Sequence, residues 1–142
     1  MDLSLLIGIP VGLLPVIIFL VVLRLMDSYQ LVSIRAVTMI IFAGGATAIL
    51  SYFINTFLFN YLALEFSQLT RYVAPVVEET LKASIIIWLL YKHRIGFLVD
   101  AAIAGFAAGA GFALVENIYY LQLQTTDNPA VWIVRGFGTA MM

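Results

Sequence analysis

The sequence predicts an all-α protein whose helices cross a membrane several times. Of its 142 residues, 63% are hydrophobic and 11% are charged, and the mean hydropathy is +1.07. Soluble globular chains carry about 25% charged residues. Four apolar stretches are each long enough to cross a hydrocarbon core of about 30 Å. Together these observations predict one polytopic α-helical membrane domain.

The expected complete spans cover residues 3–23, 36–58, 72–91 and 97–121. A fifth apolar stretch, residues 130–142, has 13 residues and would rise about 20 Å, which is too short to cross. We therefore expect a chain truncated within its fifth helix. Residues 59–70 are apolar and aromatic for a loop, so they form either an outer loop or a short interfacial helix.

Basic residues predict the orientation of these spans. They lie in the first loop, at Arg24 and Arg35, and in the third, at residues 92–94. Because cytoplasmic loops carry the excess of Lys and Arg, we expect a multi-pass protein of the cytoplasmic membrane with its N-terminus outside.

Composition also excludes several classes of protein. A net charge of −1 with seven scattered basic residues leaves no surface for nucleic acid. The absence of cysteine excludes disulfides, a thiol nucleophile and a cysteine-ligated metal. His93 is the single histidine, which excludes a histidine-pair zinc motif within these residues.

Three charged residues, Glu78, Glu79 and Lys82, lie inside the third expected span. If Lys82 marked the membrane surface, the remaining residues up to Tyr91 would rise only about 14 Å. The span must therefore begin near Tyr72, which places both carboxylates about 10 Å below the outer face. Charged groups at such depth are costly and usually functional.

Glu116 in the fourth span should lie at the same depth as these two glutamates. The short turn over residues 92–96 makes the third and fourth spans antiparallel neighbours. Glu116 lies six residues, or about 9 Å, inside the outer end at Gln122. Glu116 and Asn117 continue a stripe of small residues spaced by four, so they should face a neighbouring helix. The stripe consists of Ala101, Gly105, Gly109 and Ala113.

A cluster of carboxylates in a site of low dielectric can activate water. A protonated carboxyl beside an ionised one provides the acid and the base that this chemistry needs. Lys82 could keep either neighbouring glutamate ionised. The structural alternative is that Pro75 starts a helix, that Glu78 and Glu79 complement its N-terminal dipole, and that Lys82 merely neutralises a glutamate.

Three other polar residues have simpler interpretations. Asp100 lies three residues inside its span and is expected to be a helix-start carboxylate near water. Arg135 lies at about the depth of the glutamates and either pairs with one of them or extends outward to the interface. His93 is expected to belong to the basic cytoplasmic loop.

Two motifs resemble the PrsW family of membrane proteases, which is related to the CAAX prenyl endopeptidase superfamily. Residues 77–82 read Val-Glu-Glu-Thr-Leu-Lys, and residues 111–120 read Gly-Phe-Ala-Leu-Val-Glu-Asn-Ile-Tyr-Tyr. The family motifs are Glu-Glu-x-x-Lys on one helix, Phe-x-x-x-Glu-Asn on the next and a histidine on the one after. The first two match here in order and spacing.

The resemblance implies an intramembrane peptidase with Glu78, Glu79 and Glu116 as catalytic residues. One glutamate would be the general base for water, and Lys82 and Asn117 would orient the cluster, supported by Arg135. The implied partner is a membrane-anchored protein substrate within the lipid bilayer, such as an anti-sigma factor in stress signalling.

Metal dependence is left open by the resemblance. The chemistry is either metal-free or assisted by zinc, in which case Glu79 and Glu116 would be ligands together with the family histidine. That histidine would fall beyond Met142, so we expect the truncated chain to lack a complete catalytic site.

Two functions of other classes stay open. A small proton-coupled transporter would use a membrane carboxylate such as Glu116 to bind proton and cation alternately. A non-catalytic scaffold would use the same charges only to hold helices together. The clustering of three carboxylates with a lysine at one depth favours the protease, because such a transporter needs one glutamate per subunit.

Overall fold

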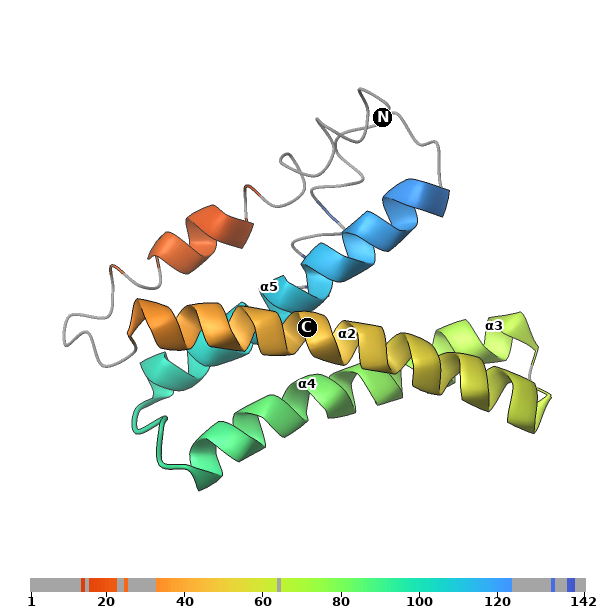
Figure 1. Ribbon diagram of the computed structural model, residues 1–142, viewed down its shortest axis with the longest axis horizontal. Coiled ribbons are helices and arrows are strands. Elements are labelled where there is room, and N and C mark those ends of the chain that lie inside the picture. The colour runs from red at the N-terminus through yellow and green to blue at the C-terminus, as the bar shows by residue number, and fades with distance from the viewer. Residues whose placement is uncertain are drawn as a thin grey trace.

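The computed structural model describes residues 14, 16–22, 25, 33–63, 65–123, 134, 138 and 139. In these parts the chain forms helices joined by short turns, which confirms the all-α prediction (Figure 1). A short helical stretch covers residues 16–22. The longer part of the chain forms, in order, α2 (Ile34–Leu62), α3 (Phe66–Gln68), the π-helical turn η1 (Leu69–Val73), α4 (Ala74–Tyr91) and α5 (Leu98–Leu123).

Helix α2 is longer than the span predicted for residues 36–58. It begins after Ser33, whose hydroxyl accepts a hydrogen bond from the Ala36 amide at 3.2 Å, as N-cap residues commonly do. It ends at Ala63, which has a left-handed backbone with φ 46°. Since α3 begins at Phe66, much of the segment predicted as a loop or separate interfacial helix is instead the end of α2 and the start of the next helix.

Helices α3, η1 and α4 follow one another without a break. Pro75 explains the wide π turn before α4, because proline cannot donate to the carbonyl four residues earlier and its ring would clash with it. At this point the Ala74 amide bonds to the Leu69 carbonyl five residues back. The helix that carries Glu78 and Glu79 therefore starts well before Pro75.

Helix α4 ends in the turn that leads to α5. The His93 amide bonds to the Leu90 carbonyl at 2.9 Å, and the Arg94 amide bonds to the Leu89 carbonyl at 3.0 Å. Together with the left-handed φ of 53° at His93, these two bonds form a Schellman motif. The exposed His93 thus terminates a helix, in the basic turn where the sequence placed it.

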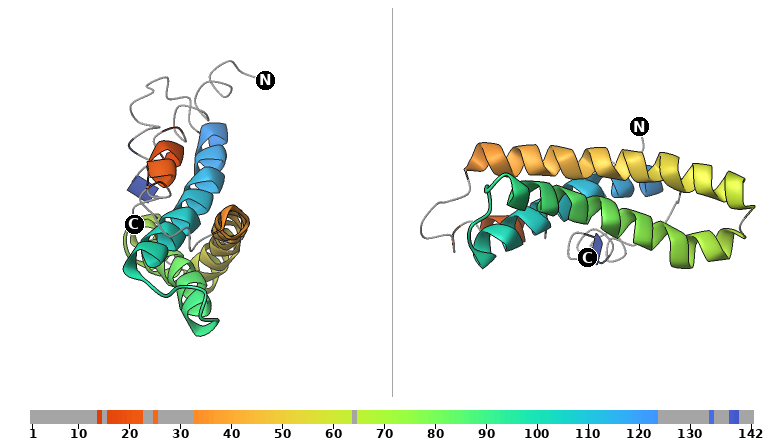
Figure 2. Two further views of the ribbon diagram at one scale, coloured as in Figure 1. Left: turned by 90° about the vertical axis from the view of Figure 1, so that its left-hand side faces the viewer. Right: turned by 90° about the horizontal axis from the view of Figure 1, so that it is seen from below.

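Helices α2, α4 and α5 pack against one another, with α5 crossing α2 (Figures 1 and 2). At the crossing the two backbones meet directly: a Cβ atom built on Gly44 would lie 2.0 Å from the Ala108 carbonyl oxygen, and one built on Gly111 would lie 1.9 Å from that of Ile41. Gly105, in the predicted small-residue stripe, has open space around its Cβ position. Helices α2 and α5 are thus in close backbone contact at Gly44 and at Gly111.

Two of the described helices, α2 and the Leu98–Tyr119 part of α5, are long and apolar enough to cross a membrane. Helix α4 has 18 residues, of which Glu78, Glu79 and Lys82 are charged, so composition alone does not mark it as a span. Four complete spans are therefore not confirmed. Most of the first expected span and most of residues 130–142 lie outside the described residues.

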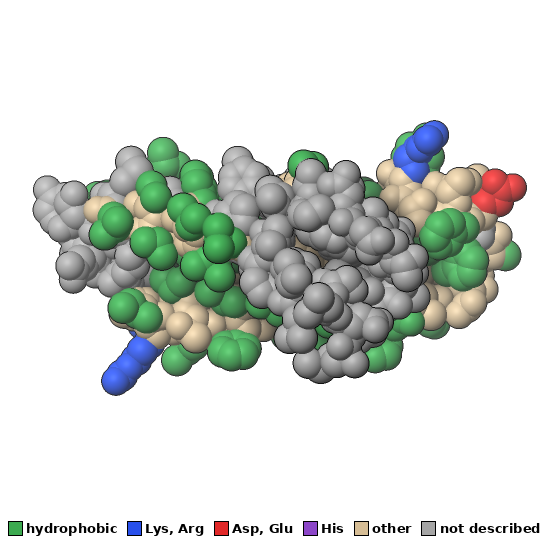
Figure 3. Space-filling view, turned by 90° about the horizontal axis from the view of Figure 1, so that it is seen from above, with side chains coloured by type: hydrophobic (Ala, Val, Ile, Leu, Met, Phe, Trp, Pro, Cys, Tyr) green, Lys and Arg blue, Asp and Glu red, His purple; other side chains and the backbone are tan. Residues whose placement is uncertain are grey.

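Many large hydrophobic side chains of the described part are exposed. Figure 3 shows hydrophobic side chains on the described parts of the visible face, with Lys or Arg side chains near both ends and an acidic side chain at the right-hand end. Large side chains on α2 point outward, including Met39, Phe42, Phe53 and Phe57. This distribution is the one a helix bundle in a bilayer requires.

Candidate active site: an acidic cluster between three helices

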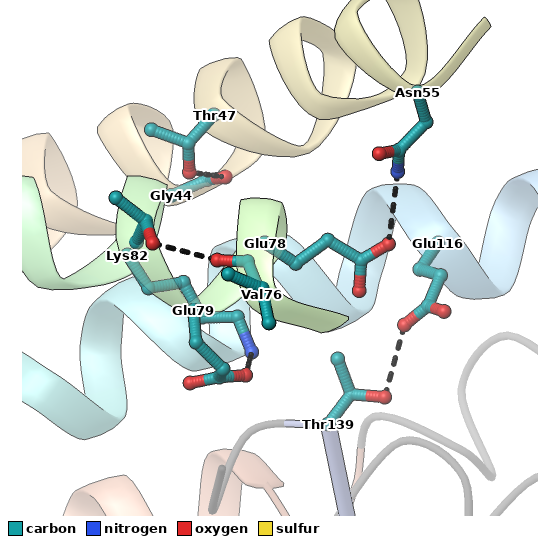
Figure 4. Close-up of polar contacts among 10 residues, drawn as sticks. Gly44, Thr47, Asn55, Val76, Glu78, Glu79, Lys82, Glu116 and Thr139 are labelled. Carbon is teal, nitrogen blue, oxygen red and sulfur yellow. Dashed lines mark hydrogen bonds and ion pairs between the residues drawn. The ribbon is translucent and has the colours of Figure 1, made fainter. Parts of the chain in front are cut away.

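The structure brings Glu78 on α4 close to Glu116 on α5. The charged neighbours of the Glu78 carboxylate are Glu116, Lys82 and Glu79. Figure 4 shows the side chains of Glu78 and Glu116 extending from facing helices into one region. Of the three carboxylates that the sequence placed at one depth, Glu78 and Glu116 are thus neighbours.

Lys82 bonds to Glu79. Its Nζ lies 2.5 Å from Glu79 Oε1, and the same ammonium lies 4.8 Å from the centre of the Phe112 ring on α5. Lys82 and Phe112 are buried, with 8% and 2% of their surfaces exposed. An ammonium over an aromatic face is an attractive contact that strengthens when water is excluded. This arrangement gives the phenylalanine of the Phe-x-x-x-Glu-Asn motif a physical role.

Glu78 has a different environment from Glu79. Its Oε1 accepts a hydrogen bond from Asn55 Nδ2 on α2 at 3.4 Å. Among the described residues, Glu78 forms no ion pair within 4.0 Å. The sequence left open which glutamate Lys82 would neutralise, and the structure answers that it is Glu79.

Glu116 is held by a hydrogen bond from the far end of the chain. Thr139 Oγ1 donates to Glu116 Oε2 at 2.9 Å (Figure 4). Glu78 and Glu116 therefore each accept one hydrogen bond from a neutral side chain, and in the described part of the molecule neither carboxylate is bonded to a cation.

Asn117 follows Glu116 and is almost fully buried, with 3% of its surface exposed. Its Oδ1 is buried and has no hydrogen-bond partner within the described residues, and the same holds for Asn55 Oδ1. Buried carbonyl oxygens are nearly always hydrogen-bonded in folded proteins, so unpaired ones call for a partner such as water or a ligand. The site offers two such acceptors.

Sequence reasoning missed Asn55 and Thr139. Asn55 could have been noticed as an amide side chain within the apolar span of residues 36–58, because polar groups in membrane helices usually face a partner helix. Thr139 carries no such signal, since threonines are common in apolar helices. Arg135, predicted to support the cluster, lies outside the described residues.

Two other predicted assignments can be compared with the structure. Asp100 Oδ2 accepts hydrogen bonds from the amides of Gly96 and Phe97, as expected of a helix-start carboxylate. The residue was also expected to lie near water, but only 3% of its surface is exposed. His93 is fifteen residues from Glu78, a rise of about 22 Å along α4. It belongs to the other end of the helix from the acidic cluster.

The helix-dipole alternative for the two glutamates is wrong. Because the helix already begins at Phe66, Glu78 lies twelve residues, or about 18 Å, inside it. The favourable interaction of an acidic side chain with a helix dipole falls off within the first turn. An interaction with the N-terminal helix dipole therefore does not explain the position of Glu78 and Glu79.

Comparison with known proteins identifies the family. A profile of the family described as "PrsW family intramembrane metalloprotease" matches residues 32–142, well over half of the chain. No curated protein and no solved structure matches the chain.

The family description implies a metal ion. Within the described part of the chain, no three Asp, Glu, His or Cys side chains are grouped closely enough to hold a metal ion. Of the two expected ligands, Glu79 is bonded to Lys82, and Glu116 to Thr139. Zinc sites usually take three or four protein ligands, so the described residues do not fit a complete zinc site.

Both motifs, Glu78-Glu79-x-x-Lys82 and Phe112-x-x-x-Glu116-Asn117, lie within the matched region, and they meet at the contact between α4 and α5. The chain is a membrane protein and belongs to the PrsW family of intramembrane proteases.

Proposed function

We propose that this protein hydrolyses a peptide bond of a membrane-anchored protein, with Glu78 and Glu116 activating the water. The observation that carries the proposal is how the charges are paired within the described part of the chain. There Lys82 bonds to Glu79, whereas Glu78 and Glu116 are neighbours that each accept a hydrogen bond from a neutral donor. Two close carboxylates in a site of low dielectric share a proton more readily than they both ionise.

The pair can then perform both proton transfers of peptide hydrolysis. The ionised carboxylate takes a proton from water as the water oxygen attacks the carbonyl carbon. The protonated carboxyl gives its proton to the leaving nitrogen as the C–N bond breaks. General acid–base catalysis of this kind contributes about 10²- to 10⁴-fold.

Glu79 and Lys82 have a supporting role in this proposal. Their ion pair, packed on Phe112, joins α4 to α5 and fixes the rotation of the helix that carries Glu78. The buried, unpaired Oδ1 of Asn117 is a candidate acceptor for a peptide N–H group of the substrate. By resemblance to other members, the substrate is a single-span protein such as an anti-sigma factor. The distribution of Lys and Arg among the loops supports a cytoplasmic-membrane protein with its N-terminus outside.

The test uses the full-length protein in liposomes with a panel of fluorescent single-span reporter proteins. We expect Glu78→Gln and Glu116→Gln each to lower kcat at least 100-fold. Glu79→Gln should lower it less, and Glu65→Gln, an exposed glutamate before α3, should leave it unchanged.

Undiminished cleavage in both Glu78→Gln and Glu116→Gln would refute the assignment, as would a wild-type protein that cleaves no reporter. Proton-coupled efflux that Glu116→Gln abolishes, without any cleavage, would instead favour the transporter interpretation.

A further inference from the structure

Asn55 differs from the serine and threonine side chains of α2 in the group to which it donates. Those four hydroxyls donate to carbonyls of their own helix three or four residues earlier: Thr38 to Ile34, Thr47 to Gly44, Ser51 to Ala48 and Thr56 to Tyr52. Asn55 Nδ2 instead reaches across to Glu78 Oε1 on α4 (Figure 4). Its side chain thus links a third helix to the carboxylate.

The other polar atom of the Asn55 side chain, its amide oxygen Oδ1, forms no hydrogen bond to another helix in the described part of the chain. This oxygen is buried and has no partner among the described residues. A buried amide with one free end costs free energy, so a purely structural role would be better filled by an apolar side chain of similar size. The contact with Glu78 is the observation that explains the amide.

We propose that Asn55 is a positioning residue for Glu78 in the hydrolytic reaction, an inference that rests on the proposed function. The hydrogen bond from Asn55 Nδ2 engages Oε1 of Glu78, so a proton taken from water is directed to the other carboxylate oxygen, Oε2. It also fixes the rotation of the carboxylate from α2, whereas Glu79 and Lys82 fix the helix that carries it. Glu78 is thereby held in one orientation before substrate arrives.

The test compares Asn55→Leu with Thr56→Val. The first removes the amide but keeps its approximate volume, and the second removes an adjacent hydroxyl that bonds only to its own helix. Because a lost bond to a carboxylate of the reacting pair acts on the transition state, we expect Asn55→Leu to lower kcat about 10- to 100-fold with KM changed less than twofold. Thr56→Val should change neither constant.

Asn55→Asp provides a second variant of nearly identical shape that lacks the N–H donor. It should lower kcat at least as much as Asn55→Leu, while both variants keep the melting temperature of the wild-type protein within a few degrees. A kcat for Asn55→Leu equal to that of Thr56→Val would refute the inference. So would a fall in kcat that is matched by an equal loss of folded protein.

These results also separate the inference from the proposed function. If Glu78→Gln abolishes cleavage while Asn55→Leu and Asn55→Asp retain it fully, the role of Asn55 is wrong and the glutamate pair stands. If Glu78→Gln cleaves like the wild-type protein, the glutamate pair itself is wrong.

Discussion

Replacement of Gly111 by alanine should separate α2 from α5 and damage both stability and catalysis. The added Cβ would lie 1.9 Å from the Ile41 carbonyl oxygen, whereas ordinary contacts begin at 3.4 Å. The backbones must therefore move apart by about 1.5 Å, the difference between these distances. The atom in the way belongs to the backbone, so rotation of a side chain cannot relieve the overlap.

The expected cost follows from comparison with a matched glycine. Gly105→Ala adds the same atom to the same helix in open space, so it should only gain helix propensity, about 1 kcal/mol. Gly111→Ala makes the same gain but must also displace a packed helix, which costs about 1–3 kcal/mol. We expect it to be less stable than Gly105→Ala by about that amount, and Gly44→Ala to behave alike, since its Cβ would lie 2.0 Å from the Ala108 carbonyl oxygen.

Catalysis should fall more steeply than stability. Glu116 follows Gly111 by five residues on α5, so a displacement of the helix moves its carboxylate relative to Glu78. Misplacement of a reacting group by about 1 Å can cost about 10²-fold in rate. Unfolding in mixed micelles with increasing SDS, followed by circular dichroism, and reporter cleavage would measure the two effects. Equal stability and activity of Gly111→Ala and Gly105→Ala would refute the close backbone contact.

Two further predictions concern the ends and the charges of α4. His93→Gly should stabilise the protein by about 1 kcal/mol in the same SDS assay, because glycine adopts the left-handed φ of 53° without steric cost. His93→Ala should not stabilise it. Equal effects of the two substitutions would argue against the Schellman turn. Lys82→Met should destabilise the protein more than the double variant Lys82→Met/Glu79→Gln, because the single change leaves Glu79 without its cation. Additive effects of these two substitutions would contradict the ion pair.

The depth of the candidate cluster could be predicted from the sequence, because it follows from the rise per residue along a helix. The rise per residue placed Glu78, Glu79 and Glu116 inside the bilayer at one depth, and the structure brings Glu78 and Glu116 together. The partner of Lys82 could not be derived in this way, because residues three and four positions earlier share its helix face. The contact with Phe112 belongs to tertiary packing and could not be read from α4 alone.

The helix contacts were less predictable than the cluster. A four-residue spacing of small residues suggested that Gly105 would face a close neighbour, but it has open space around its Cβ position, whereas Gly111 and Gly44 meet the backbone of the other helix. Most positions of α5 in this region are small, so the sequence offers several equivalent faces. The bonding of Asn55 to Glu78 likewise depends on the way α2 lies beside α4, which composition does not specify.

The π turn before α4 changes how mutations that alter chain length would act. In a regular helix at about 100° per residue, Leu69 and Glu78, nine positions apart, would lie on opposite sides. Here Leu69 is buried and Glu78 still turns toward α2 and α5, because the wide turn accommodates an additional residue. Deleting one residue between Leu69 and Glu78 would let η1 close into a regular helix in which these two residues are eight positions, or about 80°, apart. Both would then still face the interior, so a one-residue deletion here should be tolerated better than one elsewhere in the helix.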